Sequence, residues 1–288
     1  IGAILSLIPL GQTLLIKTGV VLSTTGIIIS HTETVFAKSQ EFYIDRGKSK
    51  QKTNDYKGAI EDFTKAIELN PKDGDAYYYR GYSKFKIEDY QGSIEDFTKT
   101  ININPKDGDA YYYRGSSKGN LGDYQGSIDD FTKVIELNPK DEYAYYYRGY
   151  SKFKIEDYQG SIEDFTKTIK LKPKYKNAYY YRGLSKFNSQ DYQPAIRDFS
   201  KLIKLNPKDA NAYFYRGKSK GALEDFKKAM SDFTKAIKLN PKDAEAYFLR
   251  SISKDKLGDK IGSCIDGKQA LSLGLKGKDK EWVGENGN

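Results

Sequence analysis

Residues 74–107 read GDAYYYRGYSKFKIEDYQGSIEDFTKTININPKD, and this 34-residue unit recurs along most of the chain. A proline marks the end of successive units, at Pro71, Pro105, Pro139, Pro173, Pro207 and Pro241. A glycine marks their first halves, at Gly47, Gly81, Gly115, Gly149, Gly183 and Gly217. A phenylalanine marks their second halves, at Phe63, Phe97, Phe131, Phe165, Phe199 and Phe233. Residues 76–101 and 144–169 are identical, which indicates that a two-repeat unit was copied. A fixed period of this length indicates an array of stacked structural units.

Each unit predicts two helices. In the first half, Tyr77 and Gly81 lie one turn apart on one stripe, and in the second half Tyr90 and Phe97 lie two turns apart on another. Asp89 stands between the halves and is a candidate N-cap for the second helix. An Asn-Pro pair follows that helix and ends it, because proline disfavours the helical conformation in the preceding residue.

The pattern closely resembles the tetratricopeptide repeat, a helix-turn-helix unit of 34 residues. The family's small residue at repeat position 8, aromatic at 17, small residue at 20, aromatic at 24 and proline at 32 correspond here to Gly81, Tyr90, Ser93, Phe97 and Pro105. The main departures are Arg80 and Lys84, where the family usually has leucine and tyrosine. The resemblance implies an all-α, right-handed superhelical solenoid of about seven repeats. The composition and repeat style suggest a bacterial protein, and they resemble cyanobacterial proteins.

The resemblance covers residues 40–277, and a polar tail follows at 278–288. The expected repeats are 40–73, 74–107, 108–141, 142–175, 176–209, 210–243 and a degenerate 244–277. In the last repeat, Ser251, Lys260, Gly267 and Leu275 replace the usual glycine, aromatic, phenylalanine and proline. Terminal repeats are often atypical because one face lacks a neighbour.

An arginine at repeat position 7 and an aspartate at position 23 occur in all seven repeats. The arginines are Arg46, Arg80, Arg114, Arg148, Arg182, Arg216 and Arg250. The aspartates are Asp62, Asp96, Asp130, Asp164, Asp198, Asp232 and Asp266. We expect a ladder of Arg–Asp pairs at the helix seams. The alternative, an arginine track for anionic ligands, is weakened because each aspartate neutralises its arginine.

The resemblance also implies a ligand groove lined by positions 2, 5, 9, 12 and 13 of the first helices, and these positions are rich in aromatic residues. The candidate binding residues are Tyr78, Tyr82, Phe85, Tyr112, Tyr143, Tyr146, Tyr150, Phe153, Tyr180 and Phe187. Tyrosine is typical of recognition surfaces. The alternative is that the rings pack on each other between neighbouring hairpins, and at position 5 both interpretations stay open.

A peptide or protein segment is the first candidate ligand, and a polysaccharide is the alternative because flat tyrosine faces suit sugar rings. Some members of the family hold a C-terminal carboxylate with lysine and asparagine at positions 5 and 9. That clamp is absent here, because position 5 is occupied by Ile44, Tyr78, Tyr112, Tyr146, Tyr180, Phe214 and Phe248. Single-stranded nucleic acid could stack on the same rings. The N-terminal segment described next resembles an export signal, which argues against a nucleic-acid ligand. We therefore expect a non-catalytic interaction scaffold or assembly factor, with glycan binding as the alternative.

The N-terminal segment differs from the repeats, since residues 1–29 are apolar and nearly uncharged. Val35 and Ala37 precede Lys38 in a pattern that signal peptidase accepts. A membrane anchor is the alternative, because about 20 apolar residues can span a bilayer. We expect residues 1–37 to be a signal peptide or an anchor. The protein would then be exported to a periplasm, lumen or extracellular space, or would contact a membrane through this segment alone.

Composition excludes several kinds of chemistry. The 288 residues include one cysteine, Cys264, and one histidine, His31. One cysteine forms neither an internal disulfide nor a cysteine-based zinc site. Without the leader no histidine remains, which excludes Ser-His-Asp and Cys-His mechanisms there. We expect no enzyme activity, cofactor or metal site. The net charge of +9 is consistent with a solvated basic surface, or with a surface for nucleic acid or an anionic membrane.

Overall fold

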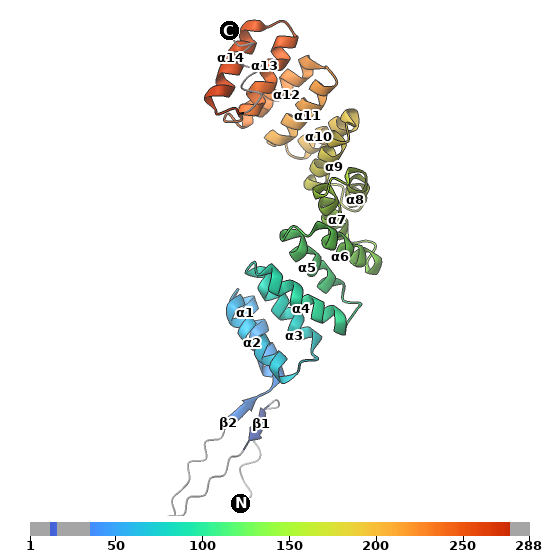
Figure 1. The fold of residues 1–288 in the computed structure, drawn as a ribbon, viewed down its shortest axis with the longest axis vertical. Helices are drawn as coiled ribbons and strands as arrows, with labels where there is room; N and C mark the ends of the chain where they lie inside the picture. The colour runs from blue at the N-terminus through green and yellow to red at the C-terminus, as the bar shows by residue number, and fades with distance from the viewer. Residues whose placement is uncertain (1–11, 16–34, 277–288) are drawn as a thin grey trace, which may run out of the picture. The chain divides into compact units, whose positions relative to one another are not determined.

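The computed structural model describes residues 12–15 and 35–276, which form fourteen helices and two short strands. The helices alternate along the chain as the first and second members of seven helical hairpins (Figure 1). The first helices are α1 (Gln40–Lys52), α3 (Gly74–Lys86), α5 (Gly108–Asn120), α7 (Glu142–Lys154), α9 (Lys176–Asn188), α11 (Ala210–Ala222) and α13 (Ala244–Lys256). The second helices are α2 (Tyr56–Leu69), α4 (Tyr90–Ile103), α6 (Tyr124–Leu137), α8 (Tyr158–Leu171), α10 (Tyr192–Leu205), α12 (Phe226–Leu239) and α14 (Lys260–Ser272). The predicted repeat architecture is confirmed.

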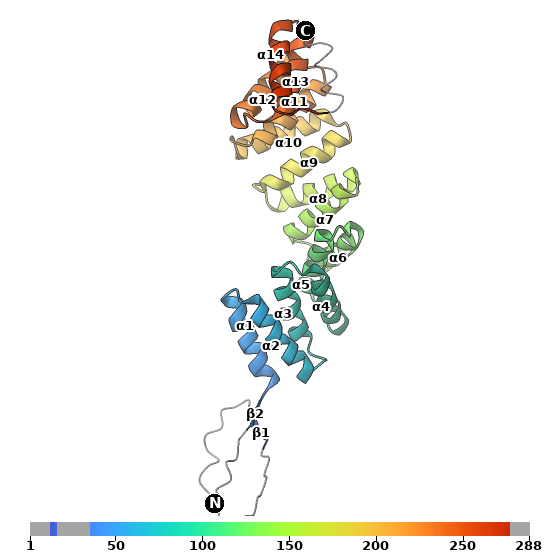
Figure 2. The ribbon, with the colours of Figure 1, turned by 60° about the vertical axis from the view of Figure 1, so that its left-hand side comes forward.

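The hairpins fall into two compact units, residues 1–137 (unit 1, with α1 to α6) and residues 138–288 (unit 2, with α7 to α14). Within each unit, the two helices of a hairpin pack together, and the second helix packs on the first helix of the next hairpin (Figure 2). Successive first helices also contact one another, as α3 does α5 and α7 does α9. No comparable contact joins the described second helices within a unit. The first helices therefore form the inner face of each unit and the second helices form its outer face.

Part of the N-terminal segment forms a short antiparallel pair, β1 (Gln12–Leu15) and β2 (Val35–Lys38). The rest of the predicted leader, and the tail from 277 onward, lie outside the described residues. Among the helices of the described ranges, none is long and apolar enough to cross a membrane. The assignment of residues 1–37 as a signal peptide or anchor stays a prediction.

The turns inside the hairpins follow the sequence signals. The Asp89 carboxylate accepts a hydrogen bond from the Gly92 N–H at 3.0 Å, which confirms it as the N-cap of α4. The residue just before the aspartate that precedes each second helix has a positive φ, for example +64° at Glu88 before Asp89 and +86° at Gly122 before Asp123. Glycine adopts this conformation without strain. The same turn is therefore built with and without glycine.

The core of each hairpin is the phenylalanine of the second helix beside the glycine of the first. The six phenylalanines that mark the repeat are each at most 2% exposed. A Cβ on Gly81 would lie 3.0 Å from Asp96 Cβ and 3.3 Å from the Phe97 ring, so a side chain there would require these neighbours to shift by a few tenths of an ångström. In the seventh hairpin Ser251 takes the glycine position and is fully buried, and both helices still form.

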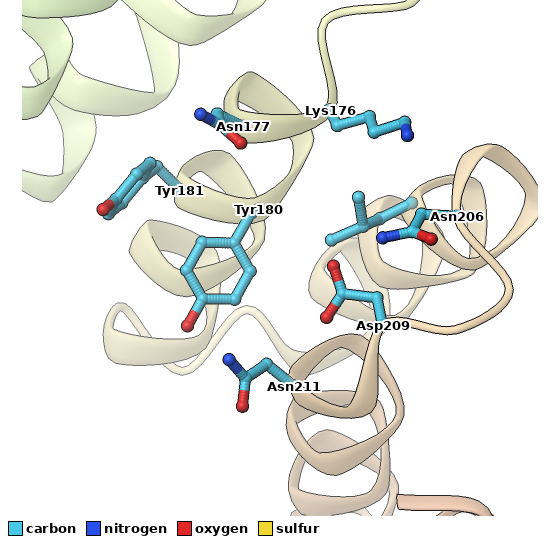
Figure 3. Close-up of a pocket in the computed structure, with 8 residues that line it drawn as sticks. Lys176, Asn177, Tyr180, Tyr181, Asn206, Asp209 and Asn211 are labelled. Carbon is cyan, nitrogen blue, oxygen red and sulfur yellow. The ribbon is translucent and has the colours of Figure 1, made fainter. Parts of the chain in front are cut away.

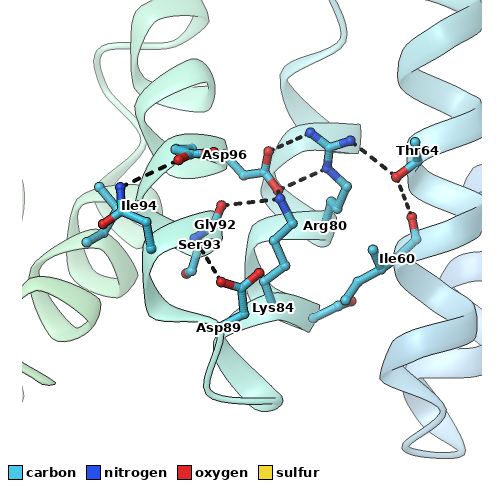
Figure 4. A network of polar contacts seen from close by, with 12 residues as sticks. Ile60, Thr64, Arg80, Lys84, Asp89, Gly92, Ser93, Ile94 and Asp96 are labelled. Carbon is cyan, nitrogen blue, oxygen red and sulfur yellow. Dashed lines mark hydrogen bonds and ion pairs between the residues drawn. The ribbon is translucent and has the colours of Figure 1, made fainter. Parts of the chain in front are cut away.

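The Arg–Asp ladder is confirmed in all seven hairpins. Figure 4 shows one pair, in which Arg80 Nε and Nη2 donate to Asp96 Oδ2 and Oδ1 at 3.0 and 2.7 Å. Arg80 Nη1 also donates to Thr64 Oγ1 of the preceding hairpin at 3.2 Å. The arginine thus closes its own hairpin and links it to its neighbour.

Each aspartate has a second cation that the sequence analysis did not assign. Lys84 Nζ lies 2.9 Å from Asp96 Oδ2. The lysine at repeat position 11 makes the same contact in each of the six remaining repeats. In the first hairpin, burial raises the pKa of Asp62, but hydrogen bonds from Arg46 and Lys50 outweigh it and hold the pKa below 3.8. The two departures from the usual family pattern, arginine and lysine, therefore serve one buried carboxylate.

Candidate binding face

In unit 1 the predicted binding residues of α3 converge on one ring that was not predicted. Tyr82 and Phe85 meet Tyr113 of α5 edge-on, with ring centroids 5.2 and 5.5 Å apart. Tyr78 meets the same ring at 6.3 Å. Tyr113 itself stacks on Phe97 at 5.7 Å and 15°. These inner-face rings are half-buried, so each packs on one side and meets solvent on the other.

The same arrangement occurs twice in unit 2. Tyr150 and Phe153 of α7 pack edge-on against Tyr181 of α9, at 5.1 and 5.7 Å. Tyr180 and Phe187 of α9 pack edge-on in the same way against Tyr215 of α11, with ring centroids 6.0 and 6.2 Å apart.

Three of the predicted residues differ from this pattern. Tyr146 is 7% exposed and packs against Tyr175, Tyr181 and Phe165, so its ring belongs to the core and lines no open groove. This corrects its assignment as a binding residue, and the physical reason is that the Tyr175 ring, 5.0 Å away, covers it in addition to Tyr181. Tyr143 is 40% exposed, and Lys172 Nζ donates to its hydroxyl at 2.6 Å. Tyr112 of α5 packs edge-on against Phe131 at 5.5 Å.

The residues that organise this face were missed. They occupy repeat position 6, namely Tyr79, Tyr113, Tyr147, Tyr181 and Tyr215. In the contacts described within each unit, Tyr79, Tyr113, Tyr181 and Tyr215 stack on the core phenylalanine of the preceding hairpin. Their recurrence in five of the seven repeats was a signal in the sequence, but helical periodicity within one hairpin does not show which neighbouring hairpin a ring contacts.

A small polar pocket opens beside the aromatic residues of unit 2, with a volume of about 280 Å³ (Figure 3). It is formed by α9, the end of α10 and the start of α11, and is lined by Lys176, Asn177, Tyr180, Tyr181, Leu202, Asn206, Asp209 and Asn211. Tyr180 comes from the predicted set. Asn177 and Asn211 occupy repeat position 2, which the family resemblance places in the groove, although they were not predicted individually. The pocket therefore presents three amide groups, one carboxylate, one ammonium group and two aromatic rings together.

Burial of the position-5 tyrosines predicts a pH effect. Desolvation raises the pKa of Tyr78, Tyr146 and Tyr180 above the ordinary 10.0. Because the folded state holds the neutral phenol, the stabilising effect is complete below pH 10 and is lost as pH rises above it. In an alkaline absorbance titration we expect these three phenols to ionise at higher pH than a free tyrosine side chain, whose pKa is about 10. In the triple Tyr→Phe variant that delayed component should shrink but not vanish, because desolvation also raises the pKa of Tyr113, Tyr175 and Tyr181. If it is unchanged, Tyr78, Tyr146 and Tyr180 do not contribute to it.

Family comparisons agree with this geometry. Tetratricopeptide repeat profiles match residues 108–141, 177–209 and 210–243, and a TPR repeat profile matches residues 47–88. The chain is a tetratricopeptide repeat protein. No curated protein sequence matches it.

Solved structures of this TPR type have the same fold. A MamA protein is 25% identical, covering 60% of this chain and 94% of its own, with a TM-score of 0.57. The C-terminal part of a TPR protein from Cytophaga hutchinsonii is 19% identical, covering 83% and 98%, with a TM-score of 0.71. YrrB, described as a TPR protein with an unusual peptide-binding site, is 22% identical, covering 64% and 95%, with a TM-score of 0.59.

Proposed function

We propose that this TPR protein is a non-catalytic interaction scaffold that binds an extended peptide segment on the inner face of unit 2. The observation that carries the proposal is the polar pocket at α9 and α11. Asn177 and Asn211 each offer an amide donor and a carbonyl acceptor, the same groups as a peptide backbone. Tyr180 supplies ring surface beside them. YrrB, with the same fold, is described as having a peptide-binding site.

The half-buried aromatic rings along α7 and α9 favour an extended ligand over a compact one. Tyr150, Phe153 and Phe187 are fixed from one side by packing, so they lose little side-chain freedom when a ligand covers the other side. Large, pre-ordered aromatic surface of this kind is typical of recognition sites. A peptide lying along α7 and α9 would contact these rings and reach the pocket with its backbone.

A glycan is the second candidate, because the pocket combines Asp209, amide groups and the Tyr180 ring. Hydroxyl groups of a sugar both donate and accept, and such a cluster satisfies both roles. Competition separates the two candidates. An oligosaccharide that displaces a bound peptide would support the glycan, and a peptide unaffected by oligosaccharides would support the peptide. We also propose, from the leader sequence, that the protein acts after export or while anchored to a membrane.

The test is a peptide selection on the protein, followed by affinity measurement with a double variant, Asn177→Ala and Asn211→Ala. Both residues are exposed, but Asn177 also forms a side-chain hydrogen bond with Tyr146, so the stability of the double variant is measured alongside its affinity. At about 1 kcal/mol for each lost hydrogen bond, we expect the affinity to fall about tenfold or more. The matched control is Asn102→Ala with Gln193→Ala, two exposed amides on second helices. Equal affinity of both double variants would refute the proposed pocket.

A further inference from the structure

The charge of the chain is divided unequally between the two units. Residues 39–137 carry 15 Lys and Arg against 18 Asp and Glu, a formal net charge of −3. Residues 138–276 carry 29 Lys and Arg against 17 Asp and Glu, a net charge of +12. The basic character of the whole protein therefore comes from unit 2, although both units are built from the same hairpin.

Most of this difference arises on the outer face, at repeat positions 22, 26, 29 and 33. In the first three repeats these positions hold Glu61, Lys65, Glu68, Lys72, Glu95, Lys99, Asn102, Lys106, Asp129, Lys133, Glu136 and Lys140. In the next three they hold Glu163, Lys167, Lys170, Lys174, Arg197, Lys201, Lys204, Lys208, Ser231, Lys235, Lys238 and Lys242. All twelve side chains of the second set are exposed. We call their ten basic members the basic outer face, which follows α8, α10 and α12.

The fold does not require these charges. In unit 1, Lys65 pairs with Glu68 at 2.8 Å, and Lys133 pairs with Glu136 at 2.7 Å, three residues along the same helix. In unit 2, repeat position 29, where Glu68 and Glu136 stand in unit 1, is occupied by Lys170, Lys204 and Lys238. Among the described residues, none of these three forms an ion pair with a side chain. Like charges at this spacing are mildly destabilising, so unit 2 forgoes a stabilising pair three times in succession.

We propose that the basic outer face of unit 2 binds an acidic segment of a partner polypeptide. Unit 1 shows which group suits a lysine at repeat position 26, since in two of its three repeats that lysine holds a glutamate carboxylate. Unit 2 lacks that carboxylate in its own helices, and a partner's glutamates and aspartates take its place. The contact is electrostatic and becomes weaker as salt is added.

The composition of the face favours an acidic polypeptide over the other polyanions. Nucleic-acid surfaces read base edges with arginine forks and hold single strands by stacking on aromatic rings. This face has nine lysines, one arginine and no aromatic residue at its twelve positions. An anionic membrane is flat, whereas the described second helices of the unit lack the contacts that join its successive first helices. A flexible acidic chain can follow such separated rows of charge.

This surface is separate from the inner face, so it does not depend on the peptide site proposed above. Seven of the ten basic residues lie on second helices, and Lys174, Lys208 and Lys242 lie in the loops that follow those helices. The pocket residues of the inner face lie mainly on α9 and α11. One scaffold could therefore hold one partner on each face of unit 2. Loss of one site should leave the other intact.

The experiment restores to unit 2 the glutamates that unit 1 already has. The full chain with Lys170→Glu, Lys204→Glu and Lys238→Glu is compared with the unchanged protein for binding to a fluorescent poly-glutamate peptide at low salt. We expect the unchanged protein to bind, and the triple variant to bind at least about tenfold more weakly. The triple variant should be as stable as the unchanged protein or more so, because each new glutamate can pair with the lysine three residues before it.

The matched control is Lys72→Glu with Lys99→Glu and Lys106→Glu, which makes the same change in net charge in unit 1. All three lysines are exposed, and the control should keep its affinity. Equal losses in both triple variants would show that net charge alone is responsible and would overturn the proposal. So would tighter binding to charge-matched single-stranded DNA, a polyuronate or phosphatidylserine vesicles than to poly-glutamate, because the partner would then belong to another class.

Discussion

Replacing Phe165 with alanine should lower the free energy of unfolding by about 3–5 kcal/mol. The ring is 0% exposed, and Tyr181 of the next hairpin stacks on it at 5.9 Å. Tyr146 packs on it from the same helix pair at 5.7 Å. Its removal leaves a cavity at the junction of two hairpins, so it weakens both the hairpin and the contact with the neighbouring one. Urea denaturation followed by circular dichroism measures the loss.

The matched control for this substitution is Phe187→Ala, another ring of unit 2 that packs on a position-6 tyrosine. Phe187 is half-buried and meets Tyr215 only at its edge. We expect its removal to cost less than half as much as that of Phe165, because part of its surface is already in water. Equal losses would mean that the phenylalanine of the second helix has no special place in the core.

Replacing Arg148 with alanine should lower the free energy of unfolding by about 3 kcal/mol, the lower end of the range for breaking a buried ion pair. The Asp164 side chain is 4% exposed and accepts two hydrogen bonds from Arg148, at 2.9 and 2.7 Å. Lys152 stays 2.9 Å from the same carboxylate and limits the loss. Ligand binding on the inner face should be unaffected. The midpoint of urea denaturation and the peptide affinity are the two measurements.

Two further variants assign the effect to the buried carboxylate. Arg148→Lys keeps the charge but loses the two-pronged contact, so it should recover only part of the stability. Asp164→Asn in the Arg148→Ala background also takes away the partner of Lys152, so it should lower the stability further. A denaturation midpoint unchanged by Arg148→Ala would contradict the view that the ladder stabilises the fold.

Much of the fold could be predicted from the sequence because the repeat gives the same local signals many times. The recurring glycine and phenylalanine identified the two faces that meet inside a hairpin, and Asp89 identified where a second helix begins. The pairing of Arg80 with Asp96 was predictable because both residues belong to one hairpin, whose geometry follows from helical periodicity.

The tertiary structure decided what lies between hairpins. Three consecutive tyrosines, Tyr145 to Tyr147, lie in the first half of α7, and periodicity within one hairpin does not tell which neighbours cover the central ring. Packing with the next hairpin buries Tyr146 and brings Tyr181 onto Phe165. The division into two units was equally hidden, because the identical segments 76–101 and 144–169 lie in different units.

The candidate sites show the same contrast. The sequence determined that aromatic residues line the first helices and that the chain is basic. Only the structure brought Asn177, Tyr180 and Asn211 to one pocket, since they come from two different hairpins. Only the structure placed Lys170 and Lys204 on an exposed outer face without acidic partners. Local sequence fixes each helix and its own stripe, while the function of a stripe depends on which surfaces the stacking of hairpins covers and which it leaves in water.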